Sequence, residues 1–445
     1  MGLDVPHKLK RGNNLCGQHF RQEWDGSVEM DTLNAALVVV GGLVLLLGFF
    51  SAYIKNRSVL SLPLLALLLG LLLGPGLNVL DPAEWGHQET ILEEAARLTL
   101  AIGLMAVALR LPRAYLKRHW RALLVLLGLV MPLMWIASGL LTYLLLDVPI
   151  LLALLIGAVI TPTDPVVASS LVSGEAAKDT LPDDDRHLLS AESGINDGLA
   201  YLLVLLPILL LLNSTGTALE HWLSMTLVRE IIGGVMVGIA AGYGAGRLLE
   251  WCEHRRLIEQ PSFLSTTIAL ALLVLGGAKL LGTNGVLAVF VAGIAFDQVV
   301  GGGERAQEHK VQESVNQFFS LPIFTLFGLM APVQEWLDLG WPLLVLGLGV
   351  LLFRRLPFVF LARRALPQLP RRRDLLFLGW FGPVGVSAMF YAMLALRKTQ
   401  EPVVWVVSSL VILASIVAHG LSATPFVKWY GRQTAAQEGV QSPRH

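Results

Sequence analysis

The stretch GAVITPTDPVVAS, residues 157–169, places two prolines and an aspartate inside an apolar run that is long enough to be a membrane helix. After a polar connection, LLSAESGINDGLAY, residues 188–201, places Glu192 and Asp197 inside the next such run. A carboxylate in hydrocarbon costs about 2.5–3.5 kcal/mol on insertion scales, so acidic residues within membrane segments mark candidate functional sites. Asp164, Glu192 and Asp197 beside a broken helix therefore predict an ion site at mid-membrane.

The composition predicts an all-α, polytopic membrane protein. Of the 445 residues, 54% are hydrophobic and only 15% are charged, whereas soluble proteins carry about 25% charged residues. Apolar runs of 18 or more residues recur along the whole chain, as multi-spanning helical proteins require. The balance of 33 basic against 33 acidic residues implies no nucleic-acid partner. Two cysteines and ten histidines without metal-ligand spacing predict neither a metal cluster nor a cofactor.

Thirteen apolar segments divide the chain after a polar N-terminal tail at residues 1–32. A second interpretation of that tail is that translation starts at Met30. The membrane region covers residues 33–430, with its core helices at about 121–212 and 339–430, and residues 431–445 form a short tail. The segments lie near 33–53, 60–78, 90–110, 121–146, 150–171, 187–212, 228–250, 262–280, 283–299, 311–332, 339–361, 374–396 and 402–429.

Basic residues gather in alternate loops, which predicts the orientation in the membrane. The positive-inside rule puts these loops in the cytoplasm, together with the C-terminus. Arg397 and Lys398 are exceptions in the opposite loops. The basic loops carry Lys55 and Arg57; Arg110, Arg113, Lys117, Arg118 and Arg121; Lys178 and Arg186; Arg247, Arg255 and Arg256; Arg305 and Lys310; and Arg363, Arg364, Arg371, Arg372 and Arg373.

The fifth segment is interrupted by Thr161-Pro162-Thr163-Asp164-Pro165. Each proline removes an N–H donor and clashes with the preceding turn, and membranes tolerate the freed carbonyls only inside protein or along a polar cavity. Carbonyls and threonine hydroxyls suit a small hard cation, and transporters build ion sites from discontinuous helices. The structural alternative is a proline kink, which alone would not need Asp164.

In the sixth segment, Glu192 and Asn196 share one helical face, and Ser193 and Asp197 share the adjacent face, because each pair is four residues apart. Burial disfavours an ionised carboxylate and a bound cation favours it. Asp197 could therefore hold either a proton or a cation, which is the simplest exchange mechanism. The alternative is a polar clamp between helices, and it has more weight for Glu192 than for Asp197.

The twelfth segment contains a second break, Gly379-Trp380-Phe381-Gly382-Pro383-Val384-Gly385. A broken helix followed by an unbroken one thus occurs twice, in segments five and six and in segments twelve and thirteen. Paired interruptions of this kind indicate inverted repeats whose broken helices cross at mid-membrane. Of the other polar residues in the apolar segments, Lys279 is consistent with a lysine reaching the membrane surface, and His419 with a hydrogen-bonded packing residue.

These motifs together resemble the sodium/proton exchanger family, and more closely its bacterial and archaeal electroneutral cation–proton antiporters. The resemblance extends over nearly the whole membrane region, including GVLAVFVAGIAF at 285–296, GWFGP at 379–383 and AHGLSATP at 418–425. It implies a homodimer in the cell membrane that exchanges protons for Na⁺, with Li⁺ or K⁺ as alternatives, by moving a core domain against a dimerisation domain.

The resemblance also implies roles for the site residues. Asp197 matches the aspartate that carries the exchanged ion. Glu192, Ser193 and Thr163 match residues that help to form the site, with the cation at Asp197, Ser193 and Thr163. Asp164 matches the aspartate that steadies the broken helix, and Asn196 matches a structural asparagine. Pro162, Pro165, Gly382 and Pro383 are expected to support the site. Because asparagine, and not a second aspartate, precedes Asp197, we expect one proton to be exchanged for one cation.

One departure from the family pattern concerns the partner of Glu192. Many relatives carry an arginine between the proline and glycine of the second break, paired with the equivalent of Glu192, but this chain has Val384. Our hypothesis is that Lys279 balances Glu192 instead. The alternative function is a channel-like or ion-sensing protein on the same scaffold, in which the changed pairing has abolished exchange. An intramembrane enzyme is disfavoured because neither HExxH nor a GxSxG elbow with partner residues is present.

Overall fold

The computed structural model describes residues 61–165, 167, 180–258, 263–300 and 305–441, and a few positions between 38 and 49. Throughout these ranges the regular structure is helical, with no strand. The N-terminal tail at 1–32, most of the first predicted segment and the connection at 168–179 lie outside the described residues.

The other twelve predicted segments all contain helix. In chain order the elements are α2 (Leu62–Leu71), η1 (Leu72–Gly76), η2 (Pro82–Trp85), α3 (Gln88–Arg110), α4 (Tyr115–Arg118), α5 (Trp120–Val125), η3 (Leu126–Val130), α6 (Met131–Leu145), α7 (Ile150–Val159), α10 (Asp183–Leu212), α11 (Thr215–His221), η4 (Trp222–Ile232), α12 (Gly233–His254), α13 (Phe263–Leu280), α14 (Gly285–Val300), α15 (Arg305–Leu329), α16 (Val333–Leu339), α17 (Trp341–Phe353), α18 (Leu356–Leu361), η5 (Ala362–Ala365), α19 (Arg372–Trp380), α20 (Val386–Thr399) and α21 (Pro402–Gln441).

Six helical stretches among the described residues are long and apolar enough to cross a membrane. The bent pair Phe318–Leu329 and Val333–Leu339 would make a seventh, and three shorter apolar helices lie at Leu62–Gly76, Ile150–Val159 and Gly285–Val300. The chain is therefore a multi-pass membrane protein, and the count of thirteen spans remains a prediction.

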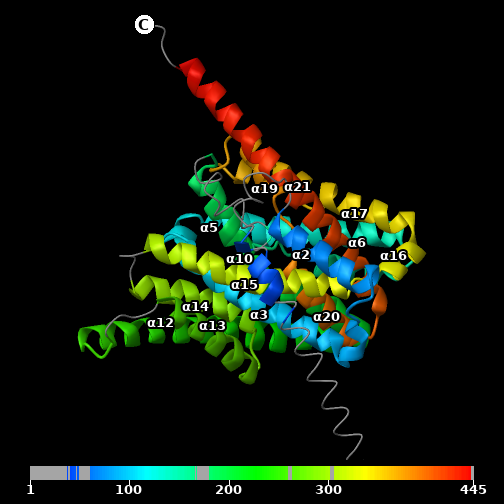
Figure 1. Ribbon diagram of the computed structural model, residues 1–445, viewed down its shortest axis with the longest axis horizontal. Coiled ribbons are helices and arrows are strands. Elements are labelled where there is room, and N and C mark those ends of the chain that lie inside the picture. The colour runs from blue at the N-terminus through cyan, green and yellow to red at the C-terminus, as the bar shows by residue number, and fades with distance from the viewer. Residues whose placement is uncertain are drawn as a thin grey trace, which may run out of the picture.

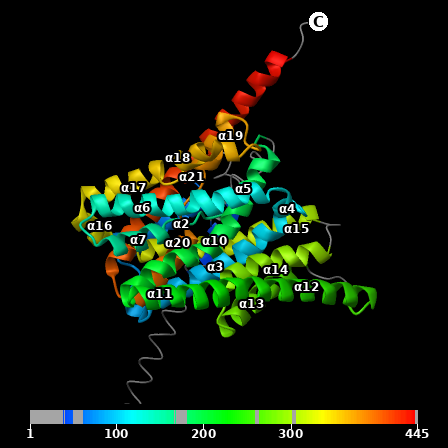
Figure 2. The same cartoon turned by 180° about the vertical axis from the view of Figure 1, so that it is seen from behind.

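The helices lie roughly alongside one another in two groups (Figures 1 and 2). In one group α12, α13 and α14 pack with α3 around their own apolar cluster, which includes Met105, Val274 and Phe296. In the other, α6 packs on α7 and α17, and α21 packs on α17 and α20. Both α10 and α20 contact the first group, through α14 and α3 respectively. These two helices therefore lie between the groups.

A row of glycines joins α12 closely to α14. Gly234, Gly238, Gly242 and Gly246 recur every four residues and are all buried. A Cβ atom added at Gly238 or Gly242 would collide with the main chain of α14. Small residues at this spacing let membrane helices approach without side chains between them, so this contact is tight along the full length of α14.

Ion pairs connect α3 to its neighbours near its first turns. Glu93 is buried and accepts two hydrogen bonds from Arg397 of α20, both of 2.8 Å. Glu94 accepts from Arg97 and from Lys279 of α13, whose Nζ lies 2.6 Å from its Oε1. Glu93 therefore ties α3 to α20.

Two features of the structure differ from the prediction made from the sequence. The eleventh segment is not one helix, because α17 ends at Phe353 and α18 begins at Leu356, with Arg354 and Arg355 between them. The last helix does not end near residue 430 but continues to Gln441, so most of the predicted C-terminal tail prolongs α21 away from the body of the molecule (Figure 1).

Candidate functional site

The first predicted break is present after α7. This helix ends at Val159, and the chain from Thr161 to Pro165 is not helical, although Thr161, Thr163 and Asp164 are fully buried. Pro162 and Pro165 have no N–H to donate to a further turn. The carbonyls at the end of α7 must therefore find partners outside their own helix.

The second predicted break separates α19 from α20 at residues 381–385. The two extended segments meet directly, because the main-chain N–H of Asp164 donates to the carbonyl of Pro383 at 2.8 Å. The Asp164 carboxylate in turn accepts from the N–H of Val386, the first residue of α20. A carboxylate in this position caps the positive end of the helix. A Cβ atom at Gly385 would collide with that carboxylate, so glycine is required there.

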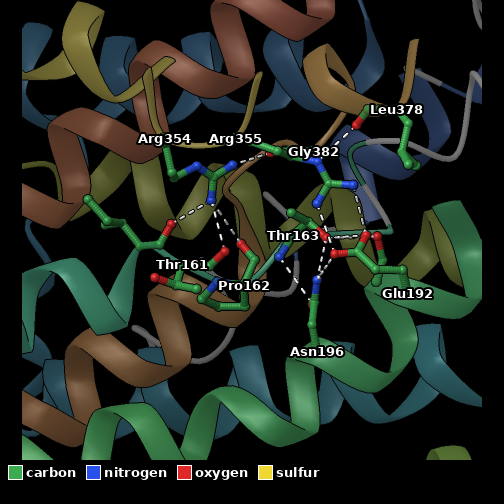
Figure 3. Close-up of polar contacts among 11 residues, drawn as sticks. Thr161, Pro162, Thr163, Glu192, Asn196, Arg354, Arg355, Leu378 and Gly382 are labelled. Atoms are coloured by element: carbon green, nitrogen blue, oxygen red, sulfur yellow. Dashed lines mark hydrogen bonds and ion pairs between the residues drawn. The ribbon is translucent and has the colours of Figure 1, made fainter. Parts of the chain in front are cut away.

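Arg354 binds the negative ends of both broken helices. Its Nη1 donates to the carbonyls of Ile160 at 2.6 Å, Thr161 at 3.0 Å and Pro162 at 3.4 Å, and its Nη2 donates to the carbonyl of Gly382 (Figure 3). Carbonyls at a helix C-terminus carry partial negative charge and lack partners within the helix. One buried guanidinium thus satisfies the freed carbonyls of both breaks.

Arg355 forms a bidentate ion pair with Glu192, at 2.8 and 3.0 Å (Figure 3). Both side chains are almost fully buried, and the Arg355 Nε also donates to the carbonyl of Leu378 at 2.9 Å. Gly382 allows the arginine to pass, since a Cβ there would lie 2.5 Å from the Arg355 side chain. The planar guanidinium fork matches a carboxylate in this way. Glu192 is therefore a compensated charge.

The hypothesis that Lys279 balances Glu192 is wrong. Lys279 pairs with Glu94 in an exposed position, and the Lys279 side chain is 60% accessible. The cation that replaces the missing arginine of the second break comes instead from the α17–α18 junction. Two adjacent arginines inside an apolar segment were a visible signal. The sequence interpretation missed them because it counted residues 339–361 as one continuous span.

A hydrogen-bonded network connects the first break to α10 (Figure 3). The Asn196 amide donates to Thr163 Oγ1 at 2.7 Å and to Glu192 Oε1 at 2.9 Å, and it accepts from the Thr163 N–H at 3.2 Å. The Thr163 hydroxyl also lies 2.9 Å from the hydroxyl of Ser193. Every one of these residues is buried. The predicted face pairing on α10 therefore holds for Glu192 and Asn196, which act on the broken helix together.

Asp197 differs from all of these groups. Its side chain is fully buried, yet neither carboxylate oxygen has a partner at hydrogen-bonding geometry among the described residues. Asp164 and Glu192 are near enough for their charges to act on it, and so is the hydroxyl of Ser387. The Ser387 oxygen likewise lacks a partner at that geometry in the described part of the chain. The Tyr391 hydroxyl donates to the main-chain carbonyl of Asp197.

His419 supports the second break, as the sequence indicated for a packing residue. Its Nε2 lies 2.9 Å from the carbonyl of Trp380, the last residue of α19, and its Nδ1 lies 2.7 Å from the carbonyl of Ser415. The Ser415 hydroxyl accepts from the N–H of Val384 at 2.7 Å. The second break is therefore held from α21 as well as by Arg354.

The arrangement can bind a small cation or a proton at one carboxylate. Near Asp197 lie the Ser387 hydroxyl and the carboxylates of Asp164 and Glu192. Glu192 is paired with Arg355, and Asp164 accepts from the N–H of Val386. No group of three or more His, Cys, Asp or Glu side chains that could hold a resident metal ion occurs in the described ranges.

The comparisons with known proteins agree with this geometry. Residues 41–429 match the family model described as "Sodium/hydrogen exchanger, transmembrane". A Na⁺/H⁺ antiporter of Saccharomyces cerevisiae is 31% identical over 432 residues, covering 90% of this chain and 44% of that protein. A Na⁺/H⁺ antiporter of Schizosaccharomyces pombe is 32% identical over 430 residues, covering 90% of this chain and 92% of that protein.

Among solved structures, the sodium proton antiporter MjNhaP1 from Methanocaldococcus jannaschii has a similar fold. It aligns with a TM-score of 0.67 at 21% identity, covering 90% of this chain and 98% of that one. The chain spans only about half the length of three of the curated relatives that it matches.

Proposed function

The chain belongs to the sodium/hydrogen exchanger family, and from this premise we propose that it is a secondary antiporter exchanging protons for Na⁺ across the cell membrane. Li⁺ and K⁺ are the alternative cations. The basic loops and the C-terminus face the cytoplasm in this proposal, and the working unit is a homodimer, as the family resemblance implies. The protein would contribute to cellular pH homeostasis.

One observation carries the proposal: Asp197 is a buried carboxylate whose oxygens have no partner at hydrogen-bonding geometry in the described chain. A buried negative charge without a partner is strongly unfavourable, so the group must be neutralised. A proton or a monovalent cation can do this, and the two exclude each other. Binding one releases the other, which is the chemical basis of exchange.

The surrounding residues support the same interpretation. The hydroxyls of Ser193 and Thr163 lie beside the break, and Ser387 adds a third hydroxyl near Asp197. Glu192 is balanced by Arg355, and Asp164 caps α20. Only Asp197 would then change its charge during the cycle. One negative group that carries either H⁺ or M⁺ gives electroneutral one-for-one exchange.

The alternative of an exchange-inactive channel or sensor rested on Val384, which seemed to leave Glu192 without a cation. Arg355 supplies that cation from α17–α18. The reason for considering the alternative is therefore removed, and we propose exchange alone.

Proton flux in proteoliposomes tests the proposal. A pH gradient is imposed, NaCl, LiCl or KCl is added in turn, and the membrane potential is clamped at zero. We expect the transported salt to dissipate the gradient without a potential, and its apparent affinity to fall as the pH falls, because protons compete for Asp197. A flux that does not saturate with salt, or that drives a membrane current, would contradict electroneutral antiport.

A further inference from the structure

A basic cavity of about 630 Å³ is lined by residues of α18, η5, α19 and the loop between η5 and α19, in a segment that the sequence predicts to be a basic cytoplasmic loop. It lies in the segment LARRALPQLPRRRDL, residues 361–375, which carries five arginines and one acidic residue. The lining residues are Phe360, Arg363, Arg364, Leu366, Pro367, Leu369, Pro370, Arg372 and Leu375.

The three lining arginines are exposed, and their guanidinium groups have no hydrogen bond or ion pair within the part of the chain that the structure describes. The one acidic residue of the segment, Asp374, does not compensate them. It is buried, and it accepts from the Tyr430 hydroxyl at 2.7 Å and from the N–H of Arg371 at 3.1 Å. The cavity therefore carries about three uncompensated positive charges.

Two other arginines of the basic loops have contacts within the protein. Arg113 donates to the carbonyl of Asp297 at 2.9 Å, and the Arg373 guanidinium lies 4.8 Å from the centre of the Tyr430 ring. The positive-inside rule explains why basic residues are here, but it does not explain why three unpaired guanidiniums converge on one cavity.

The cavity is preorganised by its apolar residues. Leu366 and Leu369 are buried and anchor the loop, and Pro367 and Pro370 restrict its backbone. Phe360 and Leu375 extend the lining toward the membrane helices α18 and α19. Arginines beside apolar residues at the end of a membrane helix are the arrangement expected where lipid headgroups meet acyl chains.

We propose that this cavity binds an anionic phosphate group. Guanidinium groups bind phosphate oxygens through paired hydrogen bonds, and basic pockets between membrane helices on the cytoplasmic side bind anionic headgroups. The phosphate can come from an anionic phospholipid or from a soluble phosphate compound. The inference does not depend on the proposed exchange, because it concerns a separate set of residues.

Native mass spectrometry of the purified full chain in neutral detergent tests this proposal. The probes are phosphatidylglycerol, phosphatidylcholine, inorganic phosphate and pyrophosphate. We expect one phosphatidylglycerol to bind per chain in preference to phosphatidylcholine. We expect the triple variant Arg363→Gln, Arg364→Gln, Arg372→Gln to bind phosphatidylglycerol at least roughly tenfold more weakly, since charged hydrogen bonds are lost.

Two further variants keep the result interpretable. Arg247→Gln, Arg255→Gln, Arg256→Gln removes the same charge near the end of α12, outside the cavity lining, and should bind as wild type does. The triple variant Arg363→Lys, Arg364→Lys, Arg372→Lys should bind phosphatidylglycerol with an affinity between those of wild type and the glutamine variant, which a misfolded protein would not do. If phosphate or pyrophosphate displaces phosphatidylglycerol, the ligand is a soluble phosphate compound. If neither displaces it, the ligand is a lipid. Equal loss in both glutamine variants, or no preference for the anionic lipid, would overturn the proposal.

Discussion

Two carboxylates on α10, only five residues apart, have opposite surroundings. Glu192 and Asp197 are both essentially inaccessible to solvent. Glu192 is bound by Arg355 through two hydrogen bonds and by the Asn196 amide through a third. Asp197 has no partner at hydrogen-bonding geometry for either oxygen among the described residues. The same helix therefore presents one fixed charge and one uncompensated charge.

This difference suits the two carboxylates to different roles: structural support for Glu192 and ion exchange for Asp197. A buried ion pair with excellent geometry keeps both members charged, and removing either member leaves an unpaired buried charge. Glu192 is thus suited to hold α10, the α17–α18 junction and the first break in one body. Asp197 is suited to change its ligand, because no cationic side chain of the described residues is paired with it. We expect substitutions at the two positions to fail in different ways.

The largest effect on transport is expected from Asp197→Asn. The amide is nearly isosteric and neutral, so exchange should fall to background for every cation, while the melting temperature stays equal or rises because a buried charge is removed. The measurements are proteoliposome flux and thermal unfolding in detergent. A variant that still exchanges would assign the transported ion to another group.

The second largest expected effect is a loss of stability in the variant Arg355→Gln. Removing one partner of a buried ion pair costs about 3–5 kcal/mol, and Glu192 would be left unpaired, so thermal unfolding should occur at a clearly lower temperature. Adding Glu192→Gln should restore part of the loss, because the second change removes the stranded charge. If the double variant is as unstable as the sum of the single variants, Arg355 and Glu192 are not energetically coupled.

The sequence predicted both breaks and all three carboxylates because their signals are local. Proline ends a helix wherever it stands, and Asp164 or Asp197 is conspicuous in an apolar run. The cation that pairs with Glu192 cannot be predicted from the neighbouring sequence, because the pairing depends on how segments distant in the chain cross. The prediction chose Lys279, while Arg355 is the partner. The role of Ser387 also depends on the crossing, since nothing in its own segment indicates a carboxylate beside it.

A smaller effect is expected from Ser387→Ala. If its hydroxyl joins the cation at Asp197, its loss should weaken the apparent cation affinity roughly 3–10-fold, the range of one net hydrogen bond, with little change in maximal rate. Ser408→Ala is a matched control, since Ser408 is also a fully buried serine without a hydrogen-bond partner in the described chain but lies on α21. Equal affinities in both variants would exclude Ser387 from the site.

The smallest effect is expected from Lys279→Ala, because Lys279 pairs with Glu94 and not with Glu192. The Lys279–Glu94 pair is largely exposed, and exposed pairs contribute about 0–1 kcal/mol and are screened by salt. Unfolding and exchange should therefore stay close to wild type, and any difference should disappear at high ionic strength. A large, salt-independent loss in Lys279→Ala would mean that its charge acts in the protein interior. That outcome would contradict the exposed pairing of Lys279 with Glu94.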